Sequence, residues 1–354
     1  MSTVASDLVN HQVRLAARPT GLPTPEVWEH TTEPVAEPAE GTFLIRVTHI
    51  SLDPAMRGWM NAGRSYIPPV EIGAVMRALA AGEVIASAHP DFAVGDHVTG
   101  VFGVQEYLTS DGKGVQKVEL GGEAVVPGEA QDSAAVPIET HLAVLGMTGM
   151  TAYFGLFDVG ALKEGETVVV SGAAGAVGSV VGQLARIKDC RVIGIAGGPE
   201  KCAWIVDELG FDAAIDYRSE DVNQAIRAAA PDGIDVYFDN VGGEILDAAL
   251  ARLRRGARVV LCGAISQYNS ESGTKGPVNY LSLLVNSARM EGFVVSNYVD
   301  RWAEAGAEMA GWLREGRLHS HEHVVPGTVA DFPDTLLKLF NGENTGKLVL
   351  ALTG

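Results

Sequence analysis

Six short apolar runs alternate with helix-length amphipathic segments from Glu166 onward, and this alternation restricts the fold more than any other feature of the chain. Buried parallel strands form nearly continuous apolar runs, and the helices that connect them cover both faces of the sheet. The pattern therefore predicts a doubly wound parallel α/β sheet of the dinucleotide-binding type. The expected strands span 167–171, 191–196, 213–217, 234–240, 257–263 and 290–296, and the expected helices span 176–188, 199–209, 219–229, 243–254, 278–288 and 301–315.

The N-terminal part has a different pattern. Strand-like runs at 43–52, 82–87 and 96–109 are separated by Gly and Pro, which predicts a mainly β unit. The chain ends in the strand-like KLVLALT, which we expect to return to that unit. The expected division is thus a β domain over 1–143, a cofactor domain over 144–316 and a returning segment over 317–354.

Charge and composition exclude several classes of partner. The chain has 44 Asp and Glu against 26 Lys and Arg, a net charge of −18, which is the wrong sign for a nucleic acid or an anionic membrane. Three scattered cysteines form no disulfide framework, and the N-terminus lacks the apolar core of a secretory signal. We therefore expect a cytoplasmic protein with a small-molecule partner. The uncharged stretch 167–185 contains four glycines, so we interpret it as strand, turn and helix instead of a membrane span.

The run SGAAGAVGS places Gly172, Gly175 and Gly178 directly after the first expected strand. Glycines let the backbone turn tightly and approach a pyrophosphate, and a helix N-terminus offers N–H groups and a positive dipole to that anion. The alternative is a turn that only packs a strand against a helix. Because six alternating strands accompany it, we interpret it as a nucleotide-binding turn.

The residues after the second expected strand indicate which dinucleotide binds. NAD-specific sites place Asp or Glu there to accept from the ribose 2′-hydroxyl. This chain has Ala196-Gly197-Gly198, which offers no carboxylate to repel a 2′-phosphate. Lys201 follows, and it is either a partner of that phosphate or a solvated surface lysine. We therefore expect NADPH as the cofactor.

Two further polar side chains follow expected strands, at the edge where such sheets bind ligands. Asn240 ends the fourth strand, and its amide either donates to the cofactor's ribose or nicotinamide or caps the next helix. Tyr268 follows the fifth strand, and it is either a donor to the substrate or an aromatic residue packed in a loop.

The chain resembles the zinc-independent medium-chain dehydrogenase/reductases, in the branch of the prostaglandin, alkenal double-bond and bacterial curcumin reductases. The resemblance rests on GMTGMTAYFGL, AAGAVGSVVGQLA, GGPEK, DYR, FDNVGGE, CGAISQYN, EGFVV and NTGK, while SLDPAMRGWM and SYIPPVEIG are most similar to the curcumin reductases. One departure is Pro199, where the family more often has an acidic residue. The resemblance implies a Rossmann domain with a GroES-like β domain, a homodimer, and NADPH-dependent reduction of the C=C bond of α,β-unsaturated ketones and aldehydes.

The same resemblance implies the site residues. Tyr268 would stabilise the enolate, and Arg57 and Tyr66 would line the substrate pocket with it. Lys201 and Tyr217 would contact the 2′-phosphate. The pyrophosphate contacts would be Gly175, Ala176, Val177 and Gly178, and Thr151 would be a further cofactor contact. The nicotinamide and its ribose would be contacted by Asn240, Cys262, Gly263, Ala264, Ile265, Ser266, Phe293, Val294, Val295 and Asn344.

We expect no metal site, because no cysteine precedes Cys190 and the histidines of the β unit, at 49, 89, 97 and 141, have no ligand spacing. Two alternative functions stay open. One is an NADPH quinone reductase with the same cofactor site. The other is a non-catalytic NADPH-binding structural protein.

Overall fold

The structure is a computed structural model that describes residues 8–120, 136–271 and 273–353. It divides into two compact units. The first comprises Met1–Leu142, Glu322–Glu343 and Leu348–Gly354, and the second comprises Ala143–His321 and Asn344–Lys347. Residues 317–321 and 344–347 thus belong to the second unit, although the sequence suggested that 317–354 returns as a whole to the β domain. The boundaries of independently folding domains stay a prediction.

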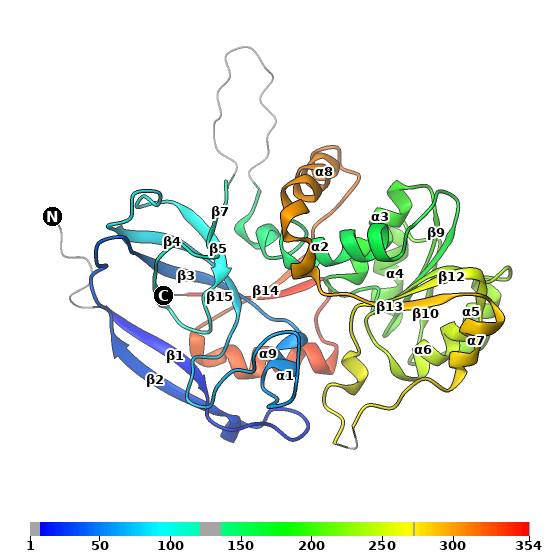
Figure 1. Ribbon diagram of the computed structural model, residues 1–354, viewed down its shortest axis with the longest axis horizontal. Helices are drawn as coiled ribbons and strands as arrows, with labels where there is room; N and C mark the ends of the chain where they lie inside the picture. Colours follow the sequence, from blue (N-terminus) through cyan, green and yellow to red (C-terminus); the bar gives the residue numbers. More distant parts are fainter. Residues whose placement is uncertain (1–7, 121–135, 272, 354) are drawn as a thin grey trace, which may run out of the picture. The chain divides into compact units, whose positions relative to one another are not determined.

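The second unit contains a six-stranded parallel sheet with strand order β10-β9-β8-β11-β12-β13 (Figure 1). The order reverses between β8 and β11, which is the switch point where doubly wound sheets bind their ligands. The expected Rossmann sheet is confirmed. Its strands are β8 (Thr167–Ser171), β9 (Arg191–Ala196), β10 (Ala213–Asp216), β11 (Ile234–Asp239), β12 (Leu253–Leu261) and β13 (Arg289–Gly292).

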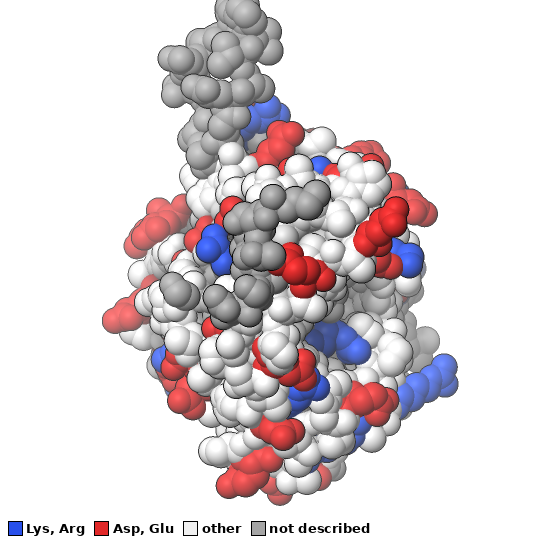
Figure 2. Space-filling model, turned by 90° about the vertical axis from the view of Figure 1, so that its left-hand side faces the viewer, with Lys and Arg blue, Asp and Glu red and all other residues white. Residues whose placement is uncertain are grey.

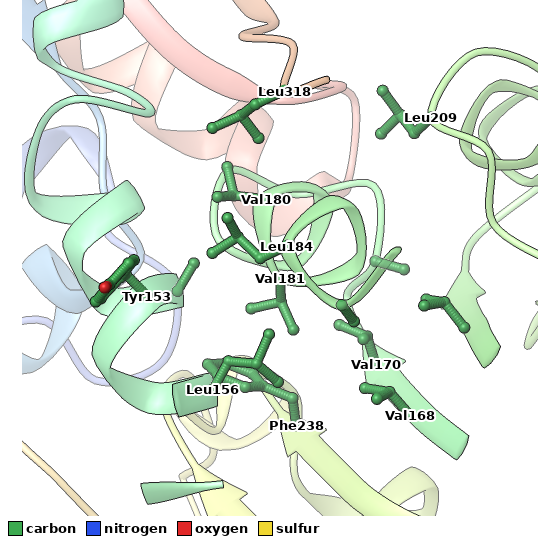
Figure 3. Close-up of a cluster of buried hydrophobic side chains, with 14 of the residues drawn as sticks. Tyr153, Leu156, Val168, Val170, Val180, Val181, Leu184, Leu209, Phe238 and Leu318 are labelled. Carbon is green, nitrogen blue, oxygen red and sulfur yellow. The ribbon is translucent and has the colours of Figure 1, made fainter. Parts of the chain in front are cut away.

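Helices cover both faces of this sheet because successive strand residues point to opposite sides. In β8, Val168 and Val170 pack with Val181 and Leu184 of α3, whereas Val169 belongs to the core on the other face (Figure 3). The helices on the first face are α2 (Met147–Phe154), α3 (Gly178–Ile187), α4 (Pro199–Asp207) and α8 (Trp302–Arg314), and those on the second are α5 (Val222–Ala229), α6 (Gly243–Leu250) and α7 (Leu281–Val285).

Several expected elements have different limits in the structure. The strand expected over 257–263 is β12 at Leu253–Leu261, and the helix expected over 278–288 is α7 at Leu281–Val285. The helix expected over 243–254 ends at Leu250, because β12 begins at Leu253 and its first residues pair with the start of β11. The strand expected over 290–296 ends at Gly292, because Gly292 pairs with Leu261, the last residue of β12, and the next two residues of that chain segment donate to the Asp239 carbonyl instead. A 3₁₀ helix follows at Val295–Arg301.

The first unit is mainly β. A seven-stranded sheet has the order β14-β15-β3-β4-β5-β7 with β6 paired to β3, and β15 from the end of the chain lies antiparallel to β3. The run expected as one strand over 96–109 is two strands, since Gly103 turns the chain at φ +77°. The elements are β1 (Val9–Leu15), β2 (Trp28–Pro34), β3 (Phe43–Ser51), α1 (Ala55–Trp59), β4 (Leu79–Ser87), β5 (His97–Val101), β6 (Tyr107–Ser110), β7 (Gln116–Lys117), β14 (Glu322–Gly327), α9 (Phe332–Asn341) and β15 (Lys347–Leu352).

The charge excess is visible at the surface. On the face in Figure 2, Asp and Glu are spread widely and Lys and Arg lie in small separate groups. Such a face does not attract a polyanion. Within the described part of the chain, no helix combines the length and the apolar character that crossing a bilayer requires. The cytoplasmic location stays a prediction.

Candidate functional site

The glycine turn after β8 forms a cradle at the start of α3. Gly172 has φ +58°, and its carbonyl accepts the N–H of Gly175 at 2.9 Å. A Cβ added to Gly178 would lie only 2.3 Å from the Gly172 oxygen, so only glycine fits there. The helix N-terminus that follows presents backbone N–H groups and a positive dipole to an anion. Gly175, Ala176, Val177 and Gly178, the expected pyrophosphate residues, all lie in this turn.

Residues 344–347 run along the same turn. The N–H of Gly346 donates to the Ala174 carbonyl at 2.8 Å, and Gly175 and Gly346 form a parallel bridge. Gly346 has φ +67°, and an added Cβ would lie 2.1 Å from the His321 oxygen. The side-chain amide of Asn344 donates to the Gly346 carbonyl at 2.9 Å. The segment that carries Asn344 is therefore part of the wall of the glycine turn.

A second turn follows β9 at Gly197 and Gly198. The Tyr217 ring packs on Gly197, where an added Cβ would lie 2.8 Å from the tyrosine oxygen, and Gly198 has φ +97°. Lys201, in the first turn of α4, donates to the Asn344 carbonyl at 2.5 Å. Burial and the nearby Arg218 cation both lower the pKa of Lys201 below its ordinary value. Lys201 is thus half-buried and bonded within the second unit, and its contact with a 2′-phosphate stays a prediction.

Sequence reasoning missed two charged residues at this turn, both at the end of β10. The Asp216 carboxylate accepts the N–H of Gly198 at 2.8 Å and that of Arg218 at 3.0 Å, and these bonds lower its pKa. The Arg218 guanidinium points towards Gly198. The available signal was the tripeptide Asp216-Tyr217-Arg218, since β10 neighbours β9 in a doubly wound sheet and its carboxyl end must lie beside this turn.

Polar contacts join the carboxyl ends of β8 and β11 at the switch point. The Asn240 side-chain amide donates to the Ser171 carbonyl at 2.7 Å. The N-cap of α6 is Gly242, so the reading of Asn240 as a helix cap is wrong. The buried Asp239 carboxylate accepts from the Ser171 hydroxyl at 2.9 Å and the Gly242 N–H at 3.0 Å, and its burial raises its pKa.

The run from Cys262 to Tyr268 is fixed to the same edge. The Asp239 carbonyl accepts the N–H of Cys262 at 2.9 Å and that of Gly263 at 3.0 Å. The N–H of Ala264 donates to the Tyr268 hydroxyl at 3.1 Å. Burial and the Asp239 charge together raise the pKa of the Cys262 thiol to about 12, so this cysteine stays protonated. Ile265 and Ser266 donate their N–H groups to the carbonyls of residues 240 and 241, which completes the rim.

Two other expected cofactor residues have partners within the second unit. The Thr151 hydroxyl donates to the Met147 carbonyl within α2 at 2.7 Å. Phe293 packs on α2 at Gly155, where an added Cβ would lie 2.7 Å from its ring. Val294 and Val295 continue from Phe293 into the 3₁₀ helix.

Arg57 and Tyr66 belong to the first unit. Arg57 is buried, and its guanidinium donates to the carbonyls of Gly21 and Pro19 and to the side chain of Asn61. Tyr66 is exposed, and its hydroxyl accepts from the Trp59 indole at 3.1 Å. Arg57 therefore holds the 19–21 loop. Tyr66 presents its ring to solvent.

Comparison with known proteins places this geometry in a family. The model "N-terminal domain of oxidoreductase" matches residues 11–118, and "Zinc-binding dehydrogenase" matches residues 176–311. The chain is 40% identical to the NADPH-dependent curcumin reductase of Escherichia coli over 350 residues, which cover 98% of this chain and 97% of the relative. It belongs to the medium-chain dehydrogenases/reductases.

Two further relatives place this medium-chain dehydrogenase/reductase in the prostaglandin and curcumin reductase branch. Prostaglandin reductase 1 of Mus musculus is 37% identical, over 93% of this chain and 95% of the relative. The crystal structure of CurA in complex with NADPH from Vibrio vulnificus matches with a TM-score of 0.88 and 42% identity, over 97% of this chain and 99% of that one. The resemblance noted from the sequence motifs is confirmed.

One matching family model has zinc in its description, so the metal ligands need a direct comparison. Over the described residues of this dehydrogenase/reductase, no group of three or more His, Cys, Asp and Glu side chains is arranged to hold a metal ion. His49 instead pairs with Glu139, and burial lowers the pKa of the histidine. Independence of a metal stays a prediction, which an activity assay tests below.

Proposed function

We propose that this chain is an NADPH-dependent reductase of carbon–carbon double bonds conjugated to a carbonyl group. The observation that carries the proposal is the turn after β9, which has no carboxylate of its own and has Lys201 and Tyr217 beside it. A cation beside this turn suits a cofactor that carries a 2′-phosphate. The relatives' names supply the reaction, since they include curcumin, prostaglandin and 2-alkenal reductases.

The residues present fit NADPH. The glycine cradle and the α3 N-terminus suit the pyrophosphate, and Lys201 with Tyr217 suits the 2′-phosphate. Asn240, the run 262–268, Phe293–Val295 and Thr151 are the residues that we assign to the nicotinamide half. We also keep Asn344 as a contact of the nicotinamide half, and its carbonyl accepts from Lys201. Bound NADPH supplies a hydride for the β-carbon of the substrate.

Tyr268 is the residue that we propose to act on the carbonyl. Addition of hydride at the β-carbon moves negative charge onto the carbonyl oxygen, and a neutral hydroxyl donor stabilises that enolate until the α-carbon is protonated. The Tyr268 oxygen accepts the N–H of Ala264, which fixes the hydroxyl beside the end of β12 and polarises it as a donor. The assignment of Arg57 and Tyr66 to substrate contacts stays a prediction from the family resemblance.

Purified protein mixed with NADPH and a panel of enones, enals and quinones tests the function. We expect NADPH oxidation with enones and enals, and saturated ketones and aldehydes as products by mass spectrometry. Turnover of quinones alone would make the protein a quinone reductase. Binding of NADPH with no turnover of any substrate would make it a non-catalytic NADPH-binding protein.

The same assay tests the metal. We expect full activity after exhaustive chelation, because the chain has no cysteine before Cys190 and the described residues hold no ligand cluster. A loss of turnover that added zinc restores would contradict this expectation.

We also propose that the chain forms a homodimer through β13, which ends the order of the parallel sheet. In the segment 278–285 that precedes it in the chain, Val278, Leu284 and Val285 are about four-fifths exposed (80%, 78% and 79%), so a single copy leaves these apolar side chains in water. Light scattering should give twice the mass of the chain at micromolar concentration, and Leu284→Glu should give the monomer. A monomeric wild-type protein would contradict the proposal.

A further inference from the structure

Arg218 is a charged residue that neither the sequence nor the proposed mechanism assigns. It directly follows Tyr217 at the end of β10, and its side chain is exposed. Over the described parts of the chain, its guanidinium takes part in no hydrogen bond or ion pair. Arg258 differs, since its guanidinium is buried and donates to Glu166 and to three backbone carbonyls. Arg218 is therefore available to a ligand.

The position of Arg218 is set by the same carboxylate that holds the Gly198 turn. Asp216 accepts the N–H of Gly198 at 2.8 Å and the N–H of Arg218 at 3.0 Å. The Arg218 Nη1 atom lies 3.8 Å from the place that a Cβ on Gly198 would occupy. A side chain at this glycine would therefore stand in contact with the guanidinium, and φ +97° at Gly198 already disfavours one. Asp216 thus holds the backbone of Arg218 beside the Gly198 turn.

Two cations lie at this turn. Arg218 and Lys201 repel each other, since the Arg218 charge lowers the pKa of the lysine. Asp216 balances part of this charge, but its oxygens already accept two backbone N–H groups and the Ser219 hydroxyl, and the Glu220 carboxylate accepts the N–H of Asp216. A doubly charged anion that contacts both cations would relieve their repulsion. Arginine also offers a planar fork of donors to phosphate oxygens, which lysine does not.

We propose that Arg218 is a specificity-determining residue that binds the 2′-phosphate of NADPH together with Lys201, and that Asp216 positions it. This inference rests on the proposed use of NADPH. It adds a second cation to the cofactor site. This cation follows β10, the strand next to β9, which carries the Gly197-Gly198 turn. NADH has a hydroxyl in place of this phosphate. Arg218 therefore raises the affinity for NADPH over NADH and contributes little to binding the parts that are common to both cofactors.

Binding measurements on the full chain test the proposal without an enone. We expect Arg218→Gln to raise the Kd for NADPH about 5- to 20-fold, the range between an exposed ion pair and a charge-assisted hydrogen bond, and to change that for NADH by less than about twofold. The Kd for 2′,5′-ADP should rise to the same degree, while the Kd for 5′-ADP should not change. The NADPH Kd of Arg218→Lys should lie between those of the wild type and Arg218→Gln, since lysine keeps the positive charge but lacks the planar set of guanidinium donors.

Arg255→Gln is the matched control. Arg255 is also exposed, but it lies near the start of β12, at the sheet edge opposite the cofactor turns. The control should bind both cofactors like the wild type. An unchanged NADPH Kd in Arg218→Gln would overturn the proposal, and so would equal losses for NADPH and NADH, which would mean that Arg218 only shapes the turn. Equal weakening by Arg255→Gln would show an effect of net charge alone.

The proposed function can fail separately. If the wild type binds NADPH and reduces no unsaturated carbonyl, the reductase assignment is wrong while the Arg218 result stands. If the wild type reduces enones and Arg218→Gln binds NADPH normally, only the inference about Arg218 is wrong.

Discussion

Lys201→Ala is expected to weaken NADPH binding by about 1.5 to 3 kcal/mol, the size of a hydrogen bond to a charged group, while NADH binding changes little. The lysine is half-buried beside the Gly197-Gly198 turn, so its attraction to a phosphate is less screened than that of a surface charge. Calorimetric titration with both cofactors measures the difference. Lys163→Ala is the control, because Lys163 is exposed and precedes β8, at the opposite edge of the sheet.

A second variant separates charge from structure. Lys201 also donates to the Asn344 carbonyl, so its removal frees one end of the segment that lines the glycine turn. Lys201→Arg keeps a cation and should recover most of the NADPH affinity. Equal losses of NADPH and NADH in Lys201→Ala would show that the lysine acts through Asn344 and not on the 2′-phosphate.

The pH dependence has a definite sign. Burial and Arg218 favour the neutral amine, so Lys201 loses its proton at a lower pH than an ordinary lysine. Its attraction to phosphate is complete below that pKa and is lost as the pH rises through it. NADPH affinity should therefore fall on the alkaline side earlier in the wild type than in Lys201→Arg, whose guanidinium stays charged.

The parallel sheet could be predicted from the sequence because its strands are buried on both faces. Runs such as 167–171 and 191–196 are continuously apolar, and their limits match β8 and β9. The prediction was less accurate at β12, whose first residues include Arg254, Arg255 and Gly256 and so lack an apolar pattern. At β13 the apolar run continued beyond the last residue of the partner strand, and a partner's length cannot be read from the run itself.

Sequence analysis identified the candidate site residues that directly follow a strand. It missed those that reach the same turn from a neighbouring strand. The glycine turn and Lys201 lie just after the strands that position them, so local sequence was enough. Asp216 and Arg218 reach the Gly198 turn from the next strand, and only the spatial order of β9 and β10 brings them there. Asn240 shows the same limit, because its partner Ser171 is 69 positions earlier and sequence alone left capping as an equal alternative.

Tyr268→Phe is expected to lower the rate of the chemical step while NADPH affinity is retained. The change keeps the ring and removes the hydroxyl that we assign to the enolate oxygen. Loss of one oxyanion donor costs about 2.7 to 4 kcal/mol, and sharing of the charge with a ribose hydroxyl or water reduces this figure. Single-turnover measurements with a long-chain 3-alken-2-one isolate the chemical step from product release. Tyr280→Phe is the control, since Tyr280 is an exposed tyrosine after the same strand.

The structure adds one requirement to this experiment. The Tyr268 oxygen accepts the Ala264 N–H, so the phenylalanine leaves that N–H without this acceptor and can loosen the turn at 262–264. Because this turn belongs to the proposed nicotinamide site, a loosened turn would weaken NADPH and NADH binding alike, whereas a lost donor lowers kcat with the Kd for NADPH intact. If Tyr268→Phe reduces the enone at the wild-type rate, Tyr268 is only a wall of the pocket. The donor must then be another hydroxyl, and Tyr66 is the first candidate because its ring is exposed and its oxygen is held only by the Trp59 indole among its described contacts.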